Sequence, residues 1–389
     1  MSLPPSEIPL GAMRFNSDSS KLEYWNGSAW FQIRTLPPAV TGARACVMTG
    51  YGPADVNTID YFNMATGGAA VDFGDDTIAR RQAGGCSSRI RGICAAGTPD
   101  VDTISFIEIA TAGNALDFGN LSGSRNGGPA GCSDSTRGLI CGGASPVQDT
   151  IDFITFASTG NATDFGNLTI NRQPPCSFSN ATRGCCAGGY AIAPLISPNQ
   201  NMTTIDFVTI AAEGNAVDFG DMTVAYRSRD SVQSPTRGIM VGGYSSVGNE
   251  SKVIDFVTIA TTGNAQDFGD IGTKFASYSQ NGYGSSTRGV FPLCDSNDSG
   301  NYVCDSLDFI TLSTLGNTVE YGDLTTDRAI ACSFSNPTRG ILVAGASPDS
   351  DDIDYNNIAT GGTSVDFGEY SAYSQLSAAS GCSNAHGGL

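Results

Sequence analysis

NATDFGNLT, residues 161–169, is a phrase that this chain repeats. Close copies begin at Asn215 (NAVDFGDMT), Asn264 (NAQDFGDIG) and Asn317 (NTVEYGDLT). Alignment on the residues that precede each DFG, or its equivalent, gives seven copies of a longer unit. They start 45 to 54 residues apart, at Thr58, Thr103, Thr150, Thr204, Val253, Ser306 and Asp352. Internal repetition of this kind indicates a fold built from one repeated supersecondary unit.

A second phrase alternates with the first. It reads TRGLICGG from Thr136, TRGCCAGG from Thr182, TRGIMVGG from Thr236 and TRGILVAG from Thr338, with weaker copies near residues 42, 90 and 287. A unit of about 45 residues with several short strands has the period of a β-propeller blade. Gly, Ser, Thr and Asn are abundant and no long run has apolar residues at helical spacing, so we expect an all-β protein.

Four short strands can be placed in each unit. The TRG phrase is one strand, TIDFVTIA (204–211) is the next, NAQDFGD (264–270) is the third, and the stretch around Cys176 is the fourth and leads back to TRG. The second of these strands has apolar residues on both faces, which indicates that each sheet is covered on both sides by its neighbours. The pattern therefore predicts seven four-stranded sheets in a closed ring.

The repeats resemble those of the kelch family. The glycine pairs at 142–143, 188–189 and 242–243 are similar to the kelch diglycine, and the DFGxLTxxR segment that ends at Arg172 resembles the tryptophan-leucine phrase and arginine of kelch blades. This chain has Phe165, Phe219 and their equivalents in place of the kelch tryptophan, and the sixth unit has Leu293–Cys294 in place of glycines. The resemblance covers about residues 40–389 and implies a seven-bladed, kelch-like β-propeller.

The two ends of the repeat region predict how the ring closes. The chain enters the repeats at GARACVMTG (42–50) without a strand before it, and its C-terminal segment contains a Cys-Ser pair at Cys382. We expect the C-terminal strand to complete the first blade, because this removes two open sheet edges at once. The propeller domain is thus expected to span residues 37–389.

Residues 1–36 lie outside the repeats. GAMRFNSDSSKLEYWNGSAWFQI (11–33) is typical of a three-stranded β-meander with turns at SDSS and NGS, and it contains both tryptophans of the chain. Residues 9–33 resemble short modules of bacteriophage tail-fibre and other virion structural proteins. The resemblance implies an attachment module, with Tyr24, Trp25 and Trp30 as its contact residues. The alternative is that the segment only caps the propeller.

Composition limits the partners and the location of the protein. A formal net charge of -18 and a pI of about 4.2 oppose binding to nucleic acid and to anionic membranes. The N-terminus has no basic start followed by an apolar block, so we expect no secretory signal, and no run is apolar enough to insert in a membrane. Twelve cysteines are too few for a disulfide scaffold, so free thiols are expected, although cross-strand pairs such as Cys132 with Cys141 could oxidise.

Catalytic chemistry is not expected. His386 is the only histidine, which argues against a histidine-dependent triad and against histidine metal ligands, and we predict no enzyme activity and no cofactor. The 295–301 loop, DSNDSGN, resembles the start of a calcium loop at Asp295, Asn297 and Ser299, but it lacks the closing glutamate.

Charged residues that recur once in each unit are expected to be architectural, because seven equal copies do not make one asymmetric substrate site. We expect arginines such as Arg137, Arg183, Arg237 and Arg339 to be largely buried and bonded to carbonyls or carboxylates. The aspartates of the DFG phrase, such as Asp164 and Asp218, are their candidate partners.

Three long loops on consecutive units are candidates for recognition. Residues 190–204, 244–253 and 295–306 should rise from one face of the ring, and they contain Tyr190, Asn201, Tyr244, Asn249 and Tyr302. Such side chains suit glycans or proteins. Neutral variation in loop length is the alternative explanation.

These observations predict a bacteriophage virion protein, assembled in the host cytoplasm. It would be a tail-fibre or tail-associated protein that recognises a glycan or protein of the host surface and joins other virion proteins through residues 1–36. A homo-oligomer is compatible with this role. The rival is a purely structural decoration or adaptor protein, and a weaker one is a glycan-acting enzyme.

Overall fold

The computed structural model describes residues 8–16, 21–32, 44–144, 146–173, 176–191, 200–227, 230–243, 251–272, 275–276, 282–296, 302–346, 348–370 and 373–385. The chain divides into two compact units, Met1–Thr41 and Gly42–Leu389. The described residues form only strands, turns and bends, so the fold is all-β as predicted. Nothing among them is a helix that could span a membrane.

The N-terminal unit contains one antiparallel sheet of order β1-β2-β3, formed by β1 (Met13–Asn16), β2 (Lys21–Trp25) and β3 (Trp30–Gln32). The tight turn between β2 and β3 forms because the Asn26 side-chain oxygen accepts hydrogen bonds from the backbone N–H groups of Ser28 and Ala29, at 2.9 and 2.8 Å. The predicted turn at residues 17–20 lies outside the described residues.

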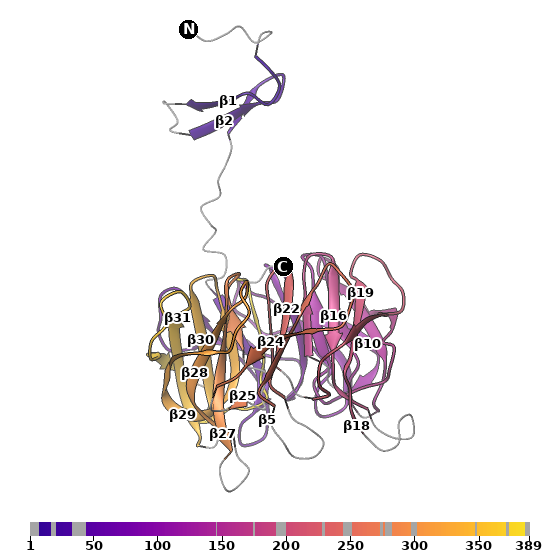
Figure 1. Ribbon diagram of the computed structural model, residues 1–389, viewed down its shortest axis with the longest axis vertical. Coiled ribbons are helices and arrows are strands. Elements are labelled where there is room, and N and C mark those ends of the chain that lie inside the picture. The colour runs from indigo at the N-terminus through magenta and orange to yellow at the C-terminus, as the bar shows by residue number, and fades with distance from the viewer. Residues whose placement is uncertain are drawn as a thin grey trace. The chain divides into compact units, whose positions relative to one another are not determined.

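The larger unit repeats a four-stranded antiparallel sheet (Figure 1). Five such sheets are separate within the described residues. Their strands are β33 (Ser380–Ser383), β4 (Arg44–Tyr51), β5 (Asp55–Asn63) and β6 (Val71–Asp75); β7 (Gly84–Ser87), β8 (Arg91–Ala95), β9 (Val101–Glu108) and β10 (Leu116–Arg125); β11 (Ala130–Ser133), β12 (Arg137–Cys141), β13 (Thr150–Thr155) and β14 (Thr163–Asn167); β15 (Cys176–Ser179), β16 (Arg183–Ala187), β19 (Thr204–Thr209) and β20 (Val217–Asp221); and β21 (Asp230–Gln233), β22 (Arg237–Val241), β23 (Val253–Thr258) and β24 (Gln266–Asp270).

The last two repeats share one sheet of eight strands, and Figure 1 shows β28 to β31 standing side by side. The long strand β29 joins them, since its first part pairs with β28 and its second part pairs with β30. The remaining strands are β25 (Phe275–Ala276), β26 (Tyr283–Gly284), β27 (Arg288–Ser296), β28 (Tyr302–Thr311), β29 (Val319–Ser335), β30 (Arg339–Ala346), β31 (Ser350–Asn357) and β32 (Val365–Glu369), and a separate hairpin is formed by β17 (Tyr190–Ala191) and β18 (Gln200–Asn201).

The repeated nine-residue phrase joins each repeat to the next. The backbone N–H groups of Gly214 and Ala216 donate to the carbonyls of Phe165 and Asn167, both at 2.8 Å, and the Asn215 side chain accepts from the N–H of Asn167 at 3.1 Å. The Gly-Asn turn of one repeat thus covers the outer edge strand of the preceding repeat. An edge covered in this way cannot pair with another chain.

The same backbone contacts connect the last repeat to the first, where Ala69 stands in place of the asparagine. The N–H groups of Gly68 and Ala70 donate to the carbonyls of Phe367 and Glu369, each at 2.9 Å. The glycine of the DFG phrase is required because a Cβ on Gly166 would lie 2.5 Å from the carbonyl oxygen of Gly214, and φ at Gly166 is +141°.

The glycine of the TRG phrase receives a side chain from the preceding repeat. A Cβ on Gly238 would lie 2.3 Å from the ring of Phe178, and one on Gly92 would lie 2.1 Å from the Sγ of Cys382. Real Cβ atoms do not approach other atoms so closely. Only glycine therefore fits at this position, because an inner-strand side chain of the preceding repeat packs against it. Each hydrophobic cluster is therefore built by two neighbouring repeats, as in the cluster of Cys46, Phe73, Ile107 and Cys382.

The C-terminal strand β33 pairs with β4, near the start of the repeats. The register places Ser380 opposite Met48 and Cys382 opposite Cys46, which is the pairing predicted from residues 42–50 and Cys382. The expectation that all cysteines are free is wrong in one place: Cys294 and Cys304 form a disulfide between the opposed strands β27 and β28. The other ten thiols, Cys132 and Cys141 among them, are free.

Candidate functional site

A cavity of about 730 Å³ lies among the first strands of the repeats. Its lining comes from β7, β11, β15, β21, β26, the end of β29, and β33, together with the turns that follow them. Serine, glycine and cysteine dominate the lining, with Phe178, Tyr283 and Phe334 as the large side chains. No charged residue lines it within the described part of the chain, although the protein has a net charge of -18.

The serine hydroxyls at this cavity link successive inner strands. Ser133 Oγ donates to the carbonyl of Ser87 at 3.3 Å, and Ser179 Oγ donates to the carbonyl of Ser133 at 3.2 Å. In a second row, Ser231 Oγ donates to the carbonyl of Ser177 at 2.9 Å. Because their protons are used between the strands, these hydroxyls offer a ligand their oxygen lone pairs. The cavity thus suits an uncharged ligand that donates hydrogen bonds.

The thiols near the cavity are poor nucleophiles. Burial raises the pKa of Cys94 to about 11 and that of Cys86 to about 12. A thiol attacks as its thiolate, and raised pKa values leave very little thiolate at neutral pH. Among the described residues, no group of histidine, cysteine or carboxylate side chains could hold a metal ion.

Fully buried arginine–aspartate ion pairs lie at the interfaces between repeats. Arg172 donates to Asp206 at 2.9 Å and to the carbonyl of Cys186 at 3.0 Å, and both charged side chains are fully buried. Arg125 with Asp152 and Arg328 with Asp354 repeat this arrangement. Each arginine follows the DFG phrase of its repeat and bonds to an aspartate in the sheet of the next repeat. These pairs hold repeats together and are inaccessible to a substrate.

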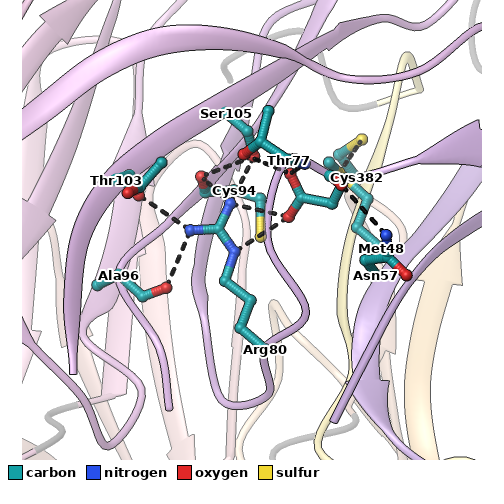
Figure 2. A network of polar contacts seen from close by, with 10 residues as sticks. Met48, Asn57, Thr77, Arg80, Cys94, Ala96, Thr103, Ser105 and Cys382 are labelled. Atoms are coloured by element: carbon teal, nitrogen blue, oxygen red, sulfur yellow. Dashed lines mark hydrogen bonds and ion pairs between the residues drawn. The ribbon is translucent and has the colours of Figure 1, made fainter. Parts of the chain in front are cut away.

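One repeat makes the same network from different residues (Figure 2). Arg80 donates to the carbonyls of Cys94, Ala96 and Thr103 and to the hydroxyl of Ser105, which occupies the place of Asp206. Its carboxylate partner is Asp76, from the connection itself, at 2.8 Å. In the sequence, Arg172 stands out only as part of the kelch-like phrase, and the signal for its buried partner is the aspartate in the IDF phrase of nearly every unit.

The repeated TRG arginines form a different set of contacts. Arg137 donates to the carbonyl of Ile210 and Arg183 to that of Ile259, in each case in the next repeat. Arg237 donates likewise to Leu312, and Arg339 of the last repeat donates to Met64 of the first at 3.1 Å. All four guanidinium groups also stack on an aromatic ring of their own sheet, at 4.5 to 4.9 Å from its centroid. They are half-buried, less than the sequence predicts.

The expected partners of these arginines are wrong. Asp164 and Asp218 are exposed, and each carboxylate accepts a hydrogen bond from the backbone N–H two residues later, at Gly166 and Gly220. The aspartate therefore shapes the bulge of the outer strand instead of forming an ion pair. The carboxylates that pair with buried arginines are those of the IDF phrase.

The predicted recognition residues are only partly described. Tyr190 and Asn201 face each other in the β17–β18 hairpin. Tyr190 is half-buried beneath the guanidinium of Arg227, at 4.5 Å, while Asn201 is only 8% exposed and so offers little surface to a ligand. Tyr244 and Asn249 lie outside the described residues, as do residues 297–301 of the loop compared with calcium sites. Tyr302 begins β28, opposite Ser296.

The N-terminal ribbon buries one predicted contact residue and exposes others. Trp25 is 5% exposed and its ring lies 5.5 Å from that of Trp30, over which Arg14 stacks at 4.3 Å. The prediction that Trp25 is a contact residue is therefore wrong, whereas Trp30 is only half-buried. Its exposed apolar side chains are instead Leu10, Met13, Phe15 and Tyr24. We call these four residues the ribbon face.

Together, the sheets define an all-β protein of repeated four-stranded antiparallel units around a neutral cavity. A solved structure described as "Structure of YjhT" has a similar fold, with a TM-score of 0.54 and 8% sequence identity over 70% of this chain and 93% of that chain. In all, 481 solved chains match. Because one fold hosts many unrelated functions, this likeness describes the fold of the chain and not its activity. No family model and no curated protein matches the sequence.

Proposed function

We propose that the chain is a bacteriophage virion protein, in which a seven-bladed, kelch-like β-propeller recognises the host surface and the N-terminal ribbon binds other tail proteins. The cyclic contacts support the propeller, because the turn at Gly68–Ala70 and the TRG arginine Arg339 each connect the last repeat to the first. The observation that supports attachment is the ribbon face. Met13 and Phe15 alternate on β1 and Tyr24 lies opposite Met13, so their side chains lie on one side of the sheet.

The ribbon face suits a protein partner. Phe15 and Met13 are 65% and 67% exposed, and a three-stranded sheet this small is marginal in isolation. Large exposed apolar side chains gathered on one side of a small module mark an interaction site. The resemblance of residues 9–33 to phage virion modules indicates that this partner is another virion subunit.

The cavity supports recognition without catalysis. It has neither a charged group nor a reactive thiol along its described lining, so it provides no general acid, base or nucleophile. The ligand class that fits best is a neutral saccharide, whose hydroxyl groups donate to the serine oxygens of the lining.

A deletion experiment tests the attachment role. Particles would be purified from a phage that encodes this chain without residues 1–36, and from one with Phe15→Ser and Met13→Ser; the matched control is Leu116→Ser, an exposed apolar residue of β10. We expect the first two chains to fold and to be absent from particles, and the control to be incorporated. Normal incorporation of all three would refute the attachment role.

Binding to cells separates the two main candidate functions. The labelled full-length protein should bind host cells, and neutral oligosaccharides from the host surface should compete for binding while acidic ones should not. Incorporation into particles without any binding to cells would favour the purely structural adaptor.

A further inference from the structure

Two pairs of cysteines lie directly opposite each other on neighbouring strands. All twelve cysteines fall within the described residues, and the strand registers oppose only Cys294 to Cys304 and Cys46 to Cys382. Every other cysteine faces a different residue type, as Cys132 faces Leu139 and Cys332 faces Val343. The first opposed pair is already a disulfide, and the second pair is reduced.

The second pair has the geometry that a disulfide needs. Opposed residues of an antiparallel pair have Cα atoms about 4.5 or 5.5 Å apart, within the range of about 4.4 to 6.8 Å found across disulfides. Their side chains lie on one face of the sheet, and Cys46 and Cys382 belong to the same buried cluster. The Sγ of Cys382 lies 3.8 Å from the Sδ of Met48, two residues along β4 from Cys46 (Figure 2).

We infer that oxidation joins Cys46 to Cys382 and so fastens the C-terminal strand β33 covalently to β4. The two thiols lose two protons and two electrons as the S–S bond forms. A small disulfide oxidant, such as oxidised glutathione, accepts them and is reduced to two thiols. The inference does not depend on the proposed virion role.

The position of this bond gives it a large effect. The two cysteines are 336 residues apart in the sequence, and β33 and β4 bring together the two ends of the repeat region. A crosslink that closes so long a loop restricts the unfolded chain strongly. Cys382 also lines the cavity, through which a small oxidant can approach it.

Oxidation is best tested during refolding. The hydrogen bond to Cys46, together with burial, raises the pKa of Cys382, so the folded protein reacts slowly. The full-length chain would be refolded in a glutathione redox buffer, blocked with iodoacetamide and mapped by mass spectrometry without reduction. We expect one peptide pair that joins Cys46 to Cys382 and another that joins Cys294 to Cys304. The second pair is the internal positive control for oxidation.

Variants test the effect on stability. The oxidised wild-type protein should have a Tm about 5–10 °C above that of the reduced protein. Cys382→Ala should abolish most of that gain, while Cys332→Ala, an equally buried cysteine without an opposed thiol, should keep it. The inference is overturned if Cys294–Cys304 is crosslinked while Cys46 and Cys382 are both alkylated. Because peptide mapping uses the wild-type chain, a variant that fails to fold leaves the test intact.

Discussion

Moving one buried carboxylate from residue 206 to residue 168 tests how the ion pairs join the repeats. Asp206 accepts hydrogen bonds from Arg172 at 2.9 Å and from the N–H and hydroxyl of Thr169 at 3.0 and 2.6 Å, and it is fully buried. Asp206→Ser would leave the guanidinium of Arg172 buried without a carboxylate. We expect the free energy of unfolding to fall by about 3–5 kcal/mol, the range measured when one partner of a buried pair is removed.

The chain itself contains the compensating arrangement. In the network of Arg80, serine stands at the position of Asp206 and the carboxylate comes from Asp76, whose equivalent in the later repeat is Leu168. The variant Leu168→Asp alone places a second carboxylate beside Asp206 and should cost about 3 kcal/mol or more. The double variant with Asp206→Ser rebuilds the Asp76 arrangement, so it should lose only the packing of Leu168, about 2 kcal/mol.

Urea unfolding, monitored by far-UV circular dichroism, would give the free energy of unfolding of all four proteins in this double-mutant cycle. The coupling energy between the two changes is expected to be about 4–6 kcal/mol in favour of the double variant. Costs that simply add would refute the reasoning, because they would mean that the arginine does not require a carboxylate in either position. A cost below about 1 kcal/mol for Asp206→Ser would refute it as well.

Burial raises the pKa of Cys94 to about 11 in the folded protein, whereas a thiol of the unfolded chain ionises near pH 9. The contribution of Cys94 to the free energy of unfolding should therefore be constant below about pH 9 and decrease as the pH rises to 11. In a series of thermal melts, Cys94→Ala should reduce the slope of Tm against pH in that range. Gly238→Ala should lower the Tm, because the new Cβ would lie 2.3 Å from the ring of Phe178, and Phe178→Ala should partly restore it. An unchanged Tm for Gly238→Ala would contradict this packing. Removal of residues 369–389 takes away β33 and should lower the Tm of the whole unit instead of freeing one end, so a truncated chain with full thermal stability would contradict closure by this strand.

Much of the fold was predictable because its determinants repeat in the sequence. The TRG, IDF and DFG phrases each became a strand, and Cys382 marked the strand that pairs with residues 42–50. Each of these inferences rests on local patterns, such as apolar residues on both faces of TIDF, that short strands express directly.

The partners of the charged residues were not predictable in the same way. Asp164 and the TRG arginine of its repeat recur with the same period as Asp206 and Arg172, so periodicity alone cannot distinguish a bulge-forming aspartate from a buried one. Only the three-dimensional contacts separate them: Asp164 is exposed and accepts from the N–H of Gly166, while Asp206 is buried and accepts from Arg172. The indole of Trp25 was misjudged because its neighbour Trp30 covers it across a tight turn, a pairing that amino-acid composition does not reveal.

The pairing of β33 with β4 sets a delay during synthesis. At about 5–20 residues per second, a ribosome needs about 15–65 s to proceed from β4 to β33. Throughout that interval β4 is present without its inner partner, and its free N–H and C=O groups can template contacts with other nascent chains. The first sheet of the repeats to be translated is thus the last of them to be finished. Cells that produce this protein at high levels should need a chaperone that shields this strand while translation continues.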